Sequence, residues 1–293
     1  GDHPTPSEAG VESARRVRAL AAYADEDDLV IGLLTGGGSA LLAAPADGVG
    51  LDALRETTEA LLASGAPIDR INAVRKHVSA VKGGRLAREL APATTVGVVF
   101  SDVTSDDPSV VASGPLSPDP TSYDDALTVL SAYGVDAPGS VTGHLQRGAA
   151  GEVGETPGPD DSAFDEVSVH ILADNATAIA AAREVCAAAG FEQLVLSSSI
   201  RGESQAAAVT HVAVAEEVQR RGDPVEPPAA ILSGGETTVV VGDGDGTGGP
   251  NQEFALAAAG ELPTRTVCCA VDTDGLDGPT DAAGAVVDPE TVD

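Results

Sequence analysis

The sequence predicts an α/β protein of two domains, a Rossmann-like, doubly wound amino-terminal domain and a smaller α/β carboxy-terminal domain. Short apolar runs such as Leu29–Leu34 and Thr95–Phe100 alternate with alanine-rich stretches of helical character. This order is typical of largely parallel strands covered by helices. The 293 residues, of which 42% are hydrophobic, are enough for one large or two ordinary domains with a buried core.

The first half of the chain is expected to alternate helix and strand. A helix is predicted over residues 4–23, with Ser7 as its N-cap because a serine hydroxyl can accept from an unpaired N–H group of the first turn. A strand is predicted over Leu29–Leu34, a helix over residues 51–64, and a second strand over Thr95–Phe100.

A boundary is predicted after the first half. From His144 to Ser162 the sequence is rich in Gly, Pro and acidic residues and has no hydrophobic period, which indicates a linker or a long surface loop. We therefore place the amino-terminal domain at residues 1–146, the linker at 147–162 and the carboxy-terminal domain at 163–293.

The second half again predicts strands and helices in alternation. The expected order is a strand over residues 167–174, a helix over 176–190, a strand over 193–199 and a helix over 203–221. Three further strand-like runs follow, each of which ends in a loop that contains glycine.

The charge of the chain is extreme. It has 46 acidic against 16 basic residues and a formal net charge of −30. The apolar, strand-length blocks argue against disorder, so the composition predicts a halophilic, cytoplasmic enzyme whose acidic surface suits concentrated salt. No apolar run approaches the ~20 residues of a membrane span, and we expect neither a nucleic acid nor a membrane as partner.

One segment departs from this acidity. Residues 70–88, here called the cationic island, contain six basic residues, include Lys76 and Lys82, which are both lysines of the chain, and contain no Asp or Glu. Ammonium and guanidinium groups neutralise phosphate or carboxylate groups that an acidic surface repels. The cationic island therefore predicts an anion-binding site.

A glycine triplet follows the first predicted strand. In Thr35–Leu42, TGGGSALL, the glycines Gly36, Gly37 and Gly38 can adopt positive φ and offer N–H groups to an anion, while Ser39 can add a hydroxyl donor. The triplet matches neither a Walker A sequence nor a G-x-G-x-x-G fingerprint. A tight turn without a ligand remains the alternative explanation.

Acidic residues follow the second predicted strand. Open α/β sheets bind their ligands at the carboxyl ends of the strands, where Asp102, Asp106 and Asp107 could bind a hydroxyl group, act as a base or hold Mg²⁺. Asp102 is the best candidate because the apolar run before it determines its position. A capping or solvated role remains the alternative for each aspartate.

The second half contains two further candidate loops. Gly248 and Gly249 precede Asn251, the predicted N-cap of a helix whose first N–H groups could bind an anion. Residues 272–285, DTDGLDGPTDAAGA, place four carboxylates on one loop, which suits a metal or a polyol as well as a solvated acidic loop. Asp243 and Asp245 lack the complete spacing of a calcium loop.

Together these blocks resemble the glycerate 2-kinase family, with a glycerate-kinase-type amino-terminal domain and a MOFRL-type carboxy-terminal domain. The matching blocks occur in family order over nearly the whole chain: HPTPSEAG, TGGGSALL, INAVRKHVSAVKGGRLA, SDVTSDDPSVVASGPLSPDPT, LSGGETTV, NQEFALAAA and DGLDGPTDAAGA. The longer blocks are far more specific than a glycine triplet.

The resemblance implies transfer of the γ-phosphoryl group of ATP to the 2-hydroxyl of D-glycerate, with Mg²⁺, to give 2-phosphoglycerate. Phosphoryl transfer needs positioning and charge neutralisation, which agrees with the cationic island and the glycine loops. The resemblance assigns catalysis to Arg75, Lys82 and Asp102, substrate binding to Gly37, Gly38, Ser39 and Lys76, nucleotide binding to Gly234, Gly235, Glu236, Gly248, Gly249 and Asn251, and metal binding to Asp274 and Asp277.

Two departures from the family pattern qualify this expectation. Relatives are expected to carry an upstream segment with a catalytic lysine in a Gly-Lys context and a stretch beyond Asp288, so residues 1–293 alone are expected to be inactive. Relatives also have arginine where this chain has Pro250, although proline suits the first turn of a helix.

Two other functions stay open at this point. Hydroxypyruvate reductase, a name often given to this family, would require a nicotinamide-binding site. A non-catalytic sugar-acid-binding module would require only the anion site. A homodimer also remains an alternative to a monomer.

Overall fold

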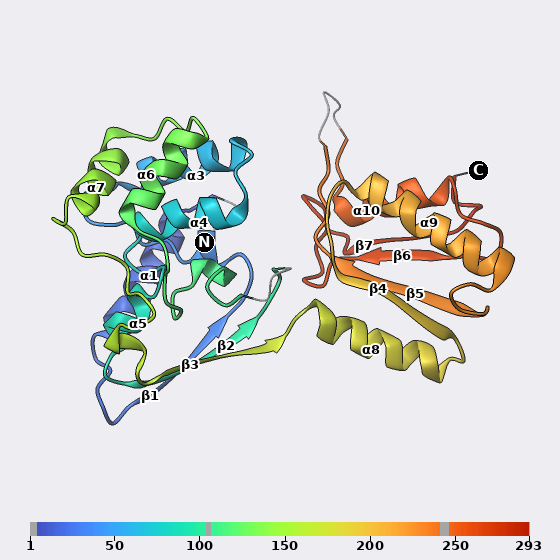
Figure 1. Ribbon diagram of the computed structural model, residues 1–293, viewed down its shortest axis with the longest axis horizontal. Coiled ribbons are helices and arrows are strands. Elements are labelled where there is room, and N and C mark those ends of the chain that lie inside the picture. Colours follow the sequence, from blue (N-terminus) through green and yellow to red (C-terminus); the bar gives the residue numbers. More distant parts are fainter. Residues whose placement is uncertain (1–4, 104–106, 241–245, 293) are drawn as a thin grey trace. The chain divides into compact units, whose positions relative to one another are not determined.

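The computed structural model describes residues 5–103, 107–240 and 246–292. The chain divides into two compact units, residues 1–174 and residues 175–293 (Figure 1). Both units combine helices with strands, as the sequence predicts. Within the described residues, no helix is long and apolar enough to cross a membrane.

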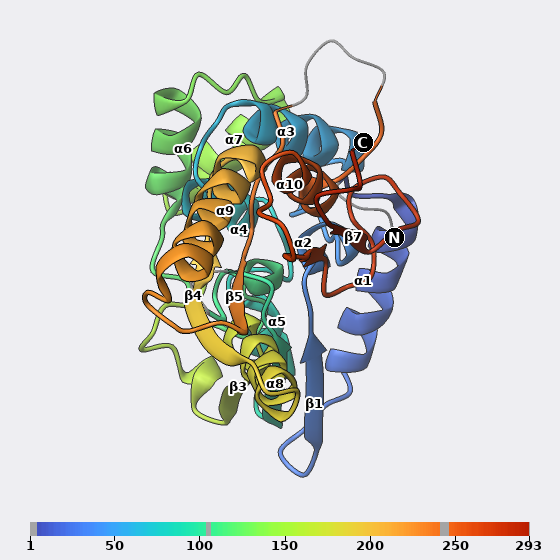
Figure 2. The same ribbon diagram turned by 90° about the vertical axis from the view of Figure 1, so that its right-hand side faces the viewer.

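The first unit contains a parallel sheet of three strands in the order β1 (Leu29–Leu34), β2 (Thr94–Phe100) and β3 (Val167–Ala173). Helix α1 (Glu8–Ala21) precedes β1, and its N-cap Ser7 accepts a hydrogen bond from the N–H of Gly10 at 3.4 Å. Figure 2 shows β1 at the edge of the sheet with α1 beside it. The predicted first helix, its cap and the first two strands are therefore present.

The third strand differs from the expected division of the chain. The run from Val167 was expected to open the second domain, but it pairs in parallel with β2, from Thr95↔Val167 to Phe100↔Ala173. A strand must satisfy its backbone hydrogen bonds on a neighbour, and β2 offers a free edge. Composition alone marks the loop before β3 as a linker, although that loop returns the chain to the same sheet.

The helices of the first unit form two groups (Figure 1). One core cluster joins α3 (Leu51–Ala63), α4 (Ile68–His77), α6 (Tyr123–Ala132) and α7 (Gly139–Ala149). The second joins α1 and α5 (Arg85–Leu90) to one face of the sheet. On the opposite face, the β1 side chains Leu29, Ile31 and Leu33 are between 62% and 69% exposed.

Helix α7 corrects the expected start of the linker. His144, where the loop was expected to begin, lies inside α7. The buried residues Val141, His144, Leu145 and Gly148 follow the i, i+3, i+4, i+7 spacing of one helix face. The glycines of this segment hide that period, and Gly148 in fact allows close packing, since a Cβ there would overlap the ring of Tyr123.

The second unit contains one parallel and one antiparallel pair of strands. Strand β4 (Glu192–Ile200) pairs in parallel with β5 (Ala229–Gly235), and β6 (Cys268–Val271) pairs antiparallel with β7 (Gly284–Val287). Its helices are α8 (Asn175–Ala188), α9 (Ser204–Arg221) and α10 (Pro250–Ala259). Figure 1 shows α8 on one face of the β4–β5 pair and α9 and α10 on the other.

In one strand-like run of the second half, the described residues form no strand. In the described part of Thr237–Val241, Thr238 makes only an isolated bridge with Glu203. Small core clusters instead hold this unit together, and they pack α10 against α9 on one side and against β6 and β7 on the other. Helix α10, whose start was predicted to bind an anion, is thus central to the second unit.

Candidate active site

The glycine turn after β1 brings three distant segments together. Gly37, with φ of 72°, precedes the short helix α2 (Gly38–Leu41). A Cβ on Gly38 would lie 2.6 Å from the Cβ of Ala112, and a Cβ on Gly36 would overlap the carboxylate of Asp102. The two glycines therefore allow the loop after β2 to lie directly against the turn after β1, so that Asp102 lies close to the glycine triplet.

A second glycine pair positions Lys82. The N–H groups of Gly83 and Gly84 donate to the carbonyl oxygens of Ser113 at 3.0 Å and Gly114 at 2.7 Å. Both glycines have positive φ, 57° and 76°, which other residues rarely adopt. Lys82 is thereby held beside the glycine turn, and its Nζ donates to the carbonyl oxygen of Leu42 at 2.9 Å.

Lys82 and Arg75 form a pair of poorly compensated cations. Burial, together with the positive charge of Arg75, lowers the pKa of Lys82 to about 7. Burial also lowers the pKa of Arg75. Neither side chain forms an ion pair with a carboxylate of the described residues. Two cations removed from water without a counter-charge favour a bound anion.

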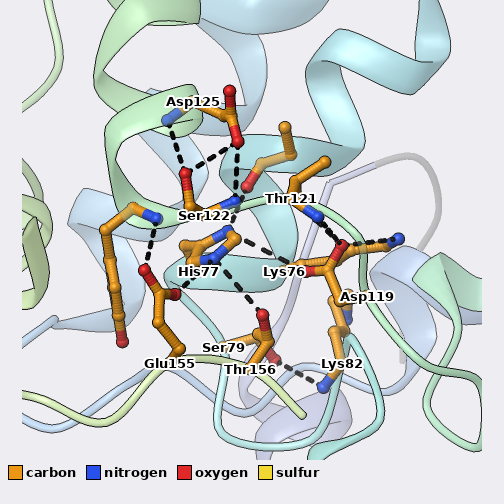
Figure 3. Close-up of polar contacts among 12 residues, drawn as sticks. Lys76, His77, Ser79, Lys82, Asp119, Thr121, Ser122, Asp125, Glu155 and Thr156 are labelled. Atoms are coloured by element: carbon orange, nitrogen blue, oxygen red, sulfur yellow. Dashed lines mark hydrogen bonds and ion pairs between the residues drawn. The ribbon is translucent and has the colours of Figure 1, made fainter. Parts of the chain in front are cut away.

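Lys76 differs from Lys82 because a carboxylate already neutralises it (Figure 3). Its Nζ lies 3.3 Å from Oδ1 of Asp119, and both side chains are buried. The same Asp119 oxygen accepts from the N–H of Thr121 at 3.1 Å and from its hydroxyl at 2.8 Å. This arrangement holds the Lys76 ammonium within the core, whereas Lys82 has only a neutral carbonyl as acceptor.

The neighbour of Lys76, His77, is also fully buried (Figure 3). Its Nδ1 lies 2.7 Å from the carbonyl oxygen of Ala73, and its Nε2 lies 3.1 Å from Oε2 of Glu155. Within the cationic island, Lys76 and His77 thus join the core network. Arg75 and Lys82, in contrast, have no carboxylate partner among the described residues.

Hydrogen bonds connect Ser39, which the sequence analysis assigned to the site, with Ser113 and Asn72, which it did not assign. The hydroxyl of Ser113 donates to Oδ1 of Asn72 at 3.0 Å, and Oγ of Ser39 lies 2.7 Å from Oγ of Ser113. Asn72 precedes Arg75 by three residues, so the two lie on the same face of α4. The spacing of Asn72 and Arg75 within INAVRKH was the available sequence signal for Asn72. Its contact with Ser113, 41 positions away, appears only in the fold.

In the second unit, the start of α10 is occupied by a carboxylate of the chain itself. Oδ1 of Asp277 accepts from the N–H of Asn251 at 2.9 Å and from its side-chain amide at 3.1 Å. Oδ2 accepts from the N–H of Gln252 at 2.7 Å. A buried anion here satisfies the free N–H groups and the positive end of the helix dipole.

This capping contact bears on the expected metal and nucleotide residues. Three of the roughly four acceptor positions of the Asp277 carboxylate are in use, and Oδ1 of Asp274 accepts from the N–H of Leu276 at 2.8 Å. Burial, together with the charges of Asp274 and Asp277, raises the pKa of Asp272. Among the described residues, no three His, Cys, Asp or Glu side chains are grouped to hold a metal ion.

The remaining nucleotide candidates lie at loop and strand ends. Gly234 and Gly235 end β5, where a Cβ on Gly235 would overlap the backbone of Ile200, and the N–H of Glu236 donates to the Ile200 carbonyl at 2.9 Å. Gly249, and not the expected Asn251, is the N-cap of α10, and a Cβ on Gly249 would overlap Asp277. Gly248 has open space around it. Close backbone approach therefore explains Gly235 and Gly249.

The acidic loop candidates have mixed outcomes. Asp107 accepts through Oδ1 from the N–H of Ser109 at 2.8 Å, a local turn contact. Asp106, Asp243 and Asp245 lie outside the described residues. Only Asp102, of the aspartates after β2, is placed against the glycine turn by the described contacts.

Comparison with known proteins gives two family matches. Residues 1–146 match a family model described as a domain of unknown function, DUF4147, and residues 229–293 match the MOFRL family. A glycerate 2-kinase of Pyrococcus horikoshii is 40% identical over 99% of this chain and 66% of its own length. A D-glycerate 2-kinase of Thermotoga maritima is 40% identical over 99% of this chain and 67% of its own length.

A third relative, from Agrobacterium vitis, is named as a hydroxypyruvate reductase and is 41% identical over 99% of this chain and 65% of its own length. The chain thus spans about two thirds of the length of these relatives. The fold also matches a crystal structure of glycerate kinase from Thermotoga maritima, which is 40% identical in sequence. The match covers 98% of this chain and 67% of the chain in that structure, with a TM-score of 0.84. The two domain matches and these relatives show that the chain belongs to the glycerate 2-kinase family.

Proposed function

We propose that the protein catalyses the ATP-dependent phosphorylation of D-glycerate at its 2-hydroxyl to give 2-phosphoglycerate. The observation that carries this proposal is the pair of cations formed by the buried Lys82 and the half-buried Arg75, which lack a carboxylate partner among the described residues. They suit the carboxylate of glycerate or a phosphoryl group. The names of the relatives support glycerate as the substrate.

The reaction exchanges one phosphorus–oxygen bond for another. The 2-hydroxyl oxygen forms a bond to the γ-phosphorus, and the bond from that phosphorus to the bridging oxygen of ADP breaks. The hydroxyl proton passes to the Asp102 carboxylate or to water. Asp102 suits this role because it lies against the glycine turn that also positions Ser39. Buried cations stabilise the charge of the transferred group.

The nucleotide and the metal are proposed from the resemblance. ATP is assigned to Gly234, Gly235, Glu236, Gly248, Gly249 and Asn251 of the second unit, of which Asn251 is already engaged with Asp277. Mg²⁺ would neutralise phosphate oxygens of the nucleotide. Asp277 does not fit as its ligand, because three hydrogen bonds occupy this buried carboxylate. No step of the mechanism therefore rests on the metal.

Hydroxypyruvate reduction is the alternative that one relative's name suggests. The letters of Gly244–Gly249 do match G-x-G-x-x-G. A dinucleotide fingerprint, however, must turn directly from a strand into a helix. Here β5, the last strand described before the match, ends at Gly235, well before Gly244. This placement favours the kinase.

The test is a pair of assays on the full-length protein. A coupled assay with D-glycerate, ATP and Mg²⁺ is expected to show turnover and 2-phosphoglycerate, and NAD(P)H with hydroxypyruvate is expected to show none. Reductase turnover without kinase turnover would refute the proposal. Binding of D-glycerate without either activity would identify a sugar-acid-binding module instead.

A further inference from the structure

A line of three side chains, Ser39, Ser113 and Asn72, crosses the candidate site with its hydrogen bonds running in one direction. Oδ1 of Asn72 carries no hydrogen, so the Ser113 hydroxyl must donate to it. Ser113 has only that one hydrogen to give. At the 2.7 Å contact between the two serines, Ser39 must therefore be the donor and Ser113 the acceptor.

Each end of this line has hydrogen-bonding capacity left for a ligand, an acceptor at Ser39 and a donor at Asn72. At one end, the single hydrogen of the Ser39 hydroxyl is engaged in the bond to Ser113, so the Ser39 oxygen can only accept a hydrogen bond from a ligand. This differs from the expected donor role of Ser39. At the other end, the side-chain nitrogen of Asn72 is buried and has no hydrogen-bond partner among the described residues, so its two hydrogens are free to donate.

The free amide of Asn72 needs an explanation. Asn72 is 3% exposed, and a buried donor without a partner costs about 1–3 kcal/mol. The turn that bears Ser113 is also held in an unfavourable conformation, since Ala112 has φ of 52° and Ser113 has φ of 60°. Costs of this kind persist where they serve a ligand site, and the cationic pair Arg75 and Lys82 lies beside this turn.

We infer that Asn72 is a positioning residue that selects hydroxy acids over plain carboxylic acids at the proposed glycerate site. A hydroxyl group both donates and accepts. It can donate to the oxygen of Ser39 and accept from the amide of Asn72, while Lys82 and Arg75 bind the carboxylate. A carboxylic acid without hydroxyls leaves both ends of the line unpaired. Ser113 orients the amide by holding its oxygen.

This inference rests on the proposed function, and one set of binding measurements separates the two. The dissociation constants of D-glycerate and of propionate, which has the same carboxylate and no hydroxyl, are measured by calorimetry on the full-length protein. The wild-type protein is expected to bind D-glycerate at least about tenfold more tightly than propionate. Asn72→Ala should weaken D-glycerate binding about tenfold, which is ~1.4 kcal/mol, and change propionate binding less than about twofold.

Two further variants make the comparison specific. Thr58→Ala is the matched control, because Thr58 is another buried polar residue of this unit and its hydroxyl donates to the carbonyl of Leu54 within its own helix. It should retain the preference for D-glycerate. Ser113→Ala keeps the Asn72 amide but releases its oxygen, and it should lose part of the preference. If Asn72→Ala does not fold, Asn72→Ser provides the same measurement.

Several results would overturn the inference. If Asn72→Ala lowers the melting temperature as Thr58→Ala does but keeps the wild-type ratio of the two affinities, Asn72 is only a structural residue. If the wild-type protein binds D-glycerate and propionate equally, the site does not read hydroxyl groups. If it binds propionate or inorganic phosphate but not D-glycerate, the proposed function fails, and the role of Asn72 fails with it.

Discussion

The ammonium of Lys82 donates to the carbonyl oxygen of Leu42 at 2.9 Å, forty positions earlier in the chain. This bond joins the cationic island to the end of the glycine-turn block TGGGSALL. A neutral carbonyl orients the lysine but does not cancel its charge. The contact therefore explains how a buried lysine is held in place and still available to an anion.

Replacing either member of the cationic pair should reduce catalysis. Lys82→Ala or Arg75→Ala is expected to lower kcat/KM for D-glycerate at least about tenfold, ~1.4 kcal/mol of transition-state stabilisation. Arg70→Ala is the matched control, because Arg70 lies on the same helix as Arg75 but is exposed and paired with Asp69. Steady-state kinetics of folded variants provide the measurement, and unchanged kcat/KM in both would remove the pair from the site.

The lowered pKa of Lys82 predicts a pH-dependent change in stability. Its pKa is about 7 in the folded protein and 10.5 without the perturbation, so burial of the charged form costs stability in full below pH 7. That cost decreases as the pH rises from 7 towards 10.5, because the folded protein loses the proton and the unfolded chain keeps it.

Lys82→Met should therefore raise the melting temperature most at pH 6, and the gain should shrink as the pH rises to 10. Thermal unfolding of both proteins across this range provides the measurement, in buffer without phosphate or carboxylates. A gain that grows with pH would show that Lys82 is stabilised, rather than destabilised, by its surroundings.

Local patterns in the sequence were sufficient for much of the fold. The apolar runs of β1 and β2 and the serine cap of α1 are short-range signals, and all three were predicted correctly. The place of β3 could not be predicted in the same way, because pairing with β2 is a contact across more than seventy residues. Composition distinguishes a loop from a helix but does not say to which sheet the next strand returns.

The candidate site shows the same limit. Clustering of charge identified Lys82 and Arg75, but only the fold shows that Asp119 neutralises Lys76. Likewise, the sequence shows a helix start at Asn251 and an acidic loop containing Asp277 as separate anion and metal candidates. Their contact at 2.9 Å, across 26 positions, shows that one caps the other.

Removing the cap of α10 should destabilise the second unit. Asp277→Ala takes away an acceptor for the N–H groups of Asn251 and Gln252. Loss of a helix cap costs about 0.5–2 kcal/mol, and this one is buried. Asp281→Ala, in the same acidic loop but exposed, is the control and should be nearly neutral. Urea unfolding measures both, and equal midpoints for Asp277→Ala and wild type would contradict the capping role.

The net charge of −30 predicts that stability depends on salt. Repulsion among exposed carboxylates, such as the consecutive Asp25, Glu26, Asp27 and Asp28, is screened as the Debye length falls from ~10 Å at 0.1 M salt to ~3 Å at 1 M. The melting temperature should therefore rise steeply with added KCl. Sorbitol at equal osmolality is the control, because it changes hydration without screening charge. A melting temperature that is flat in KCl, or that rises equally in sorbitol, would show that charge repulsion does not limit the stability of this protein.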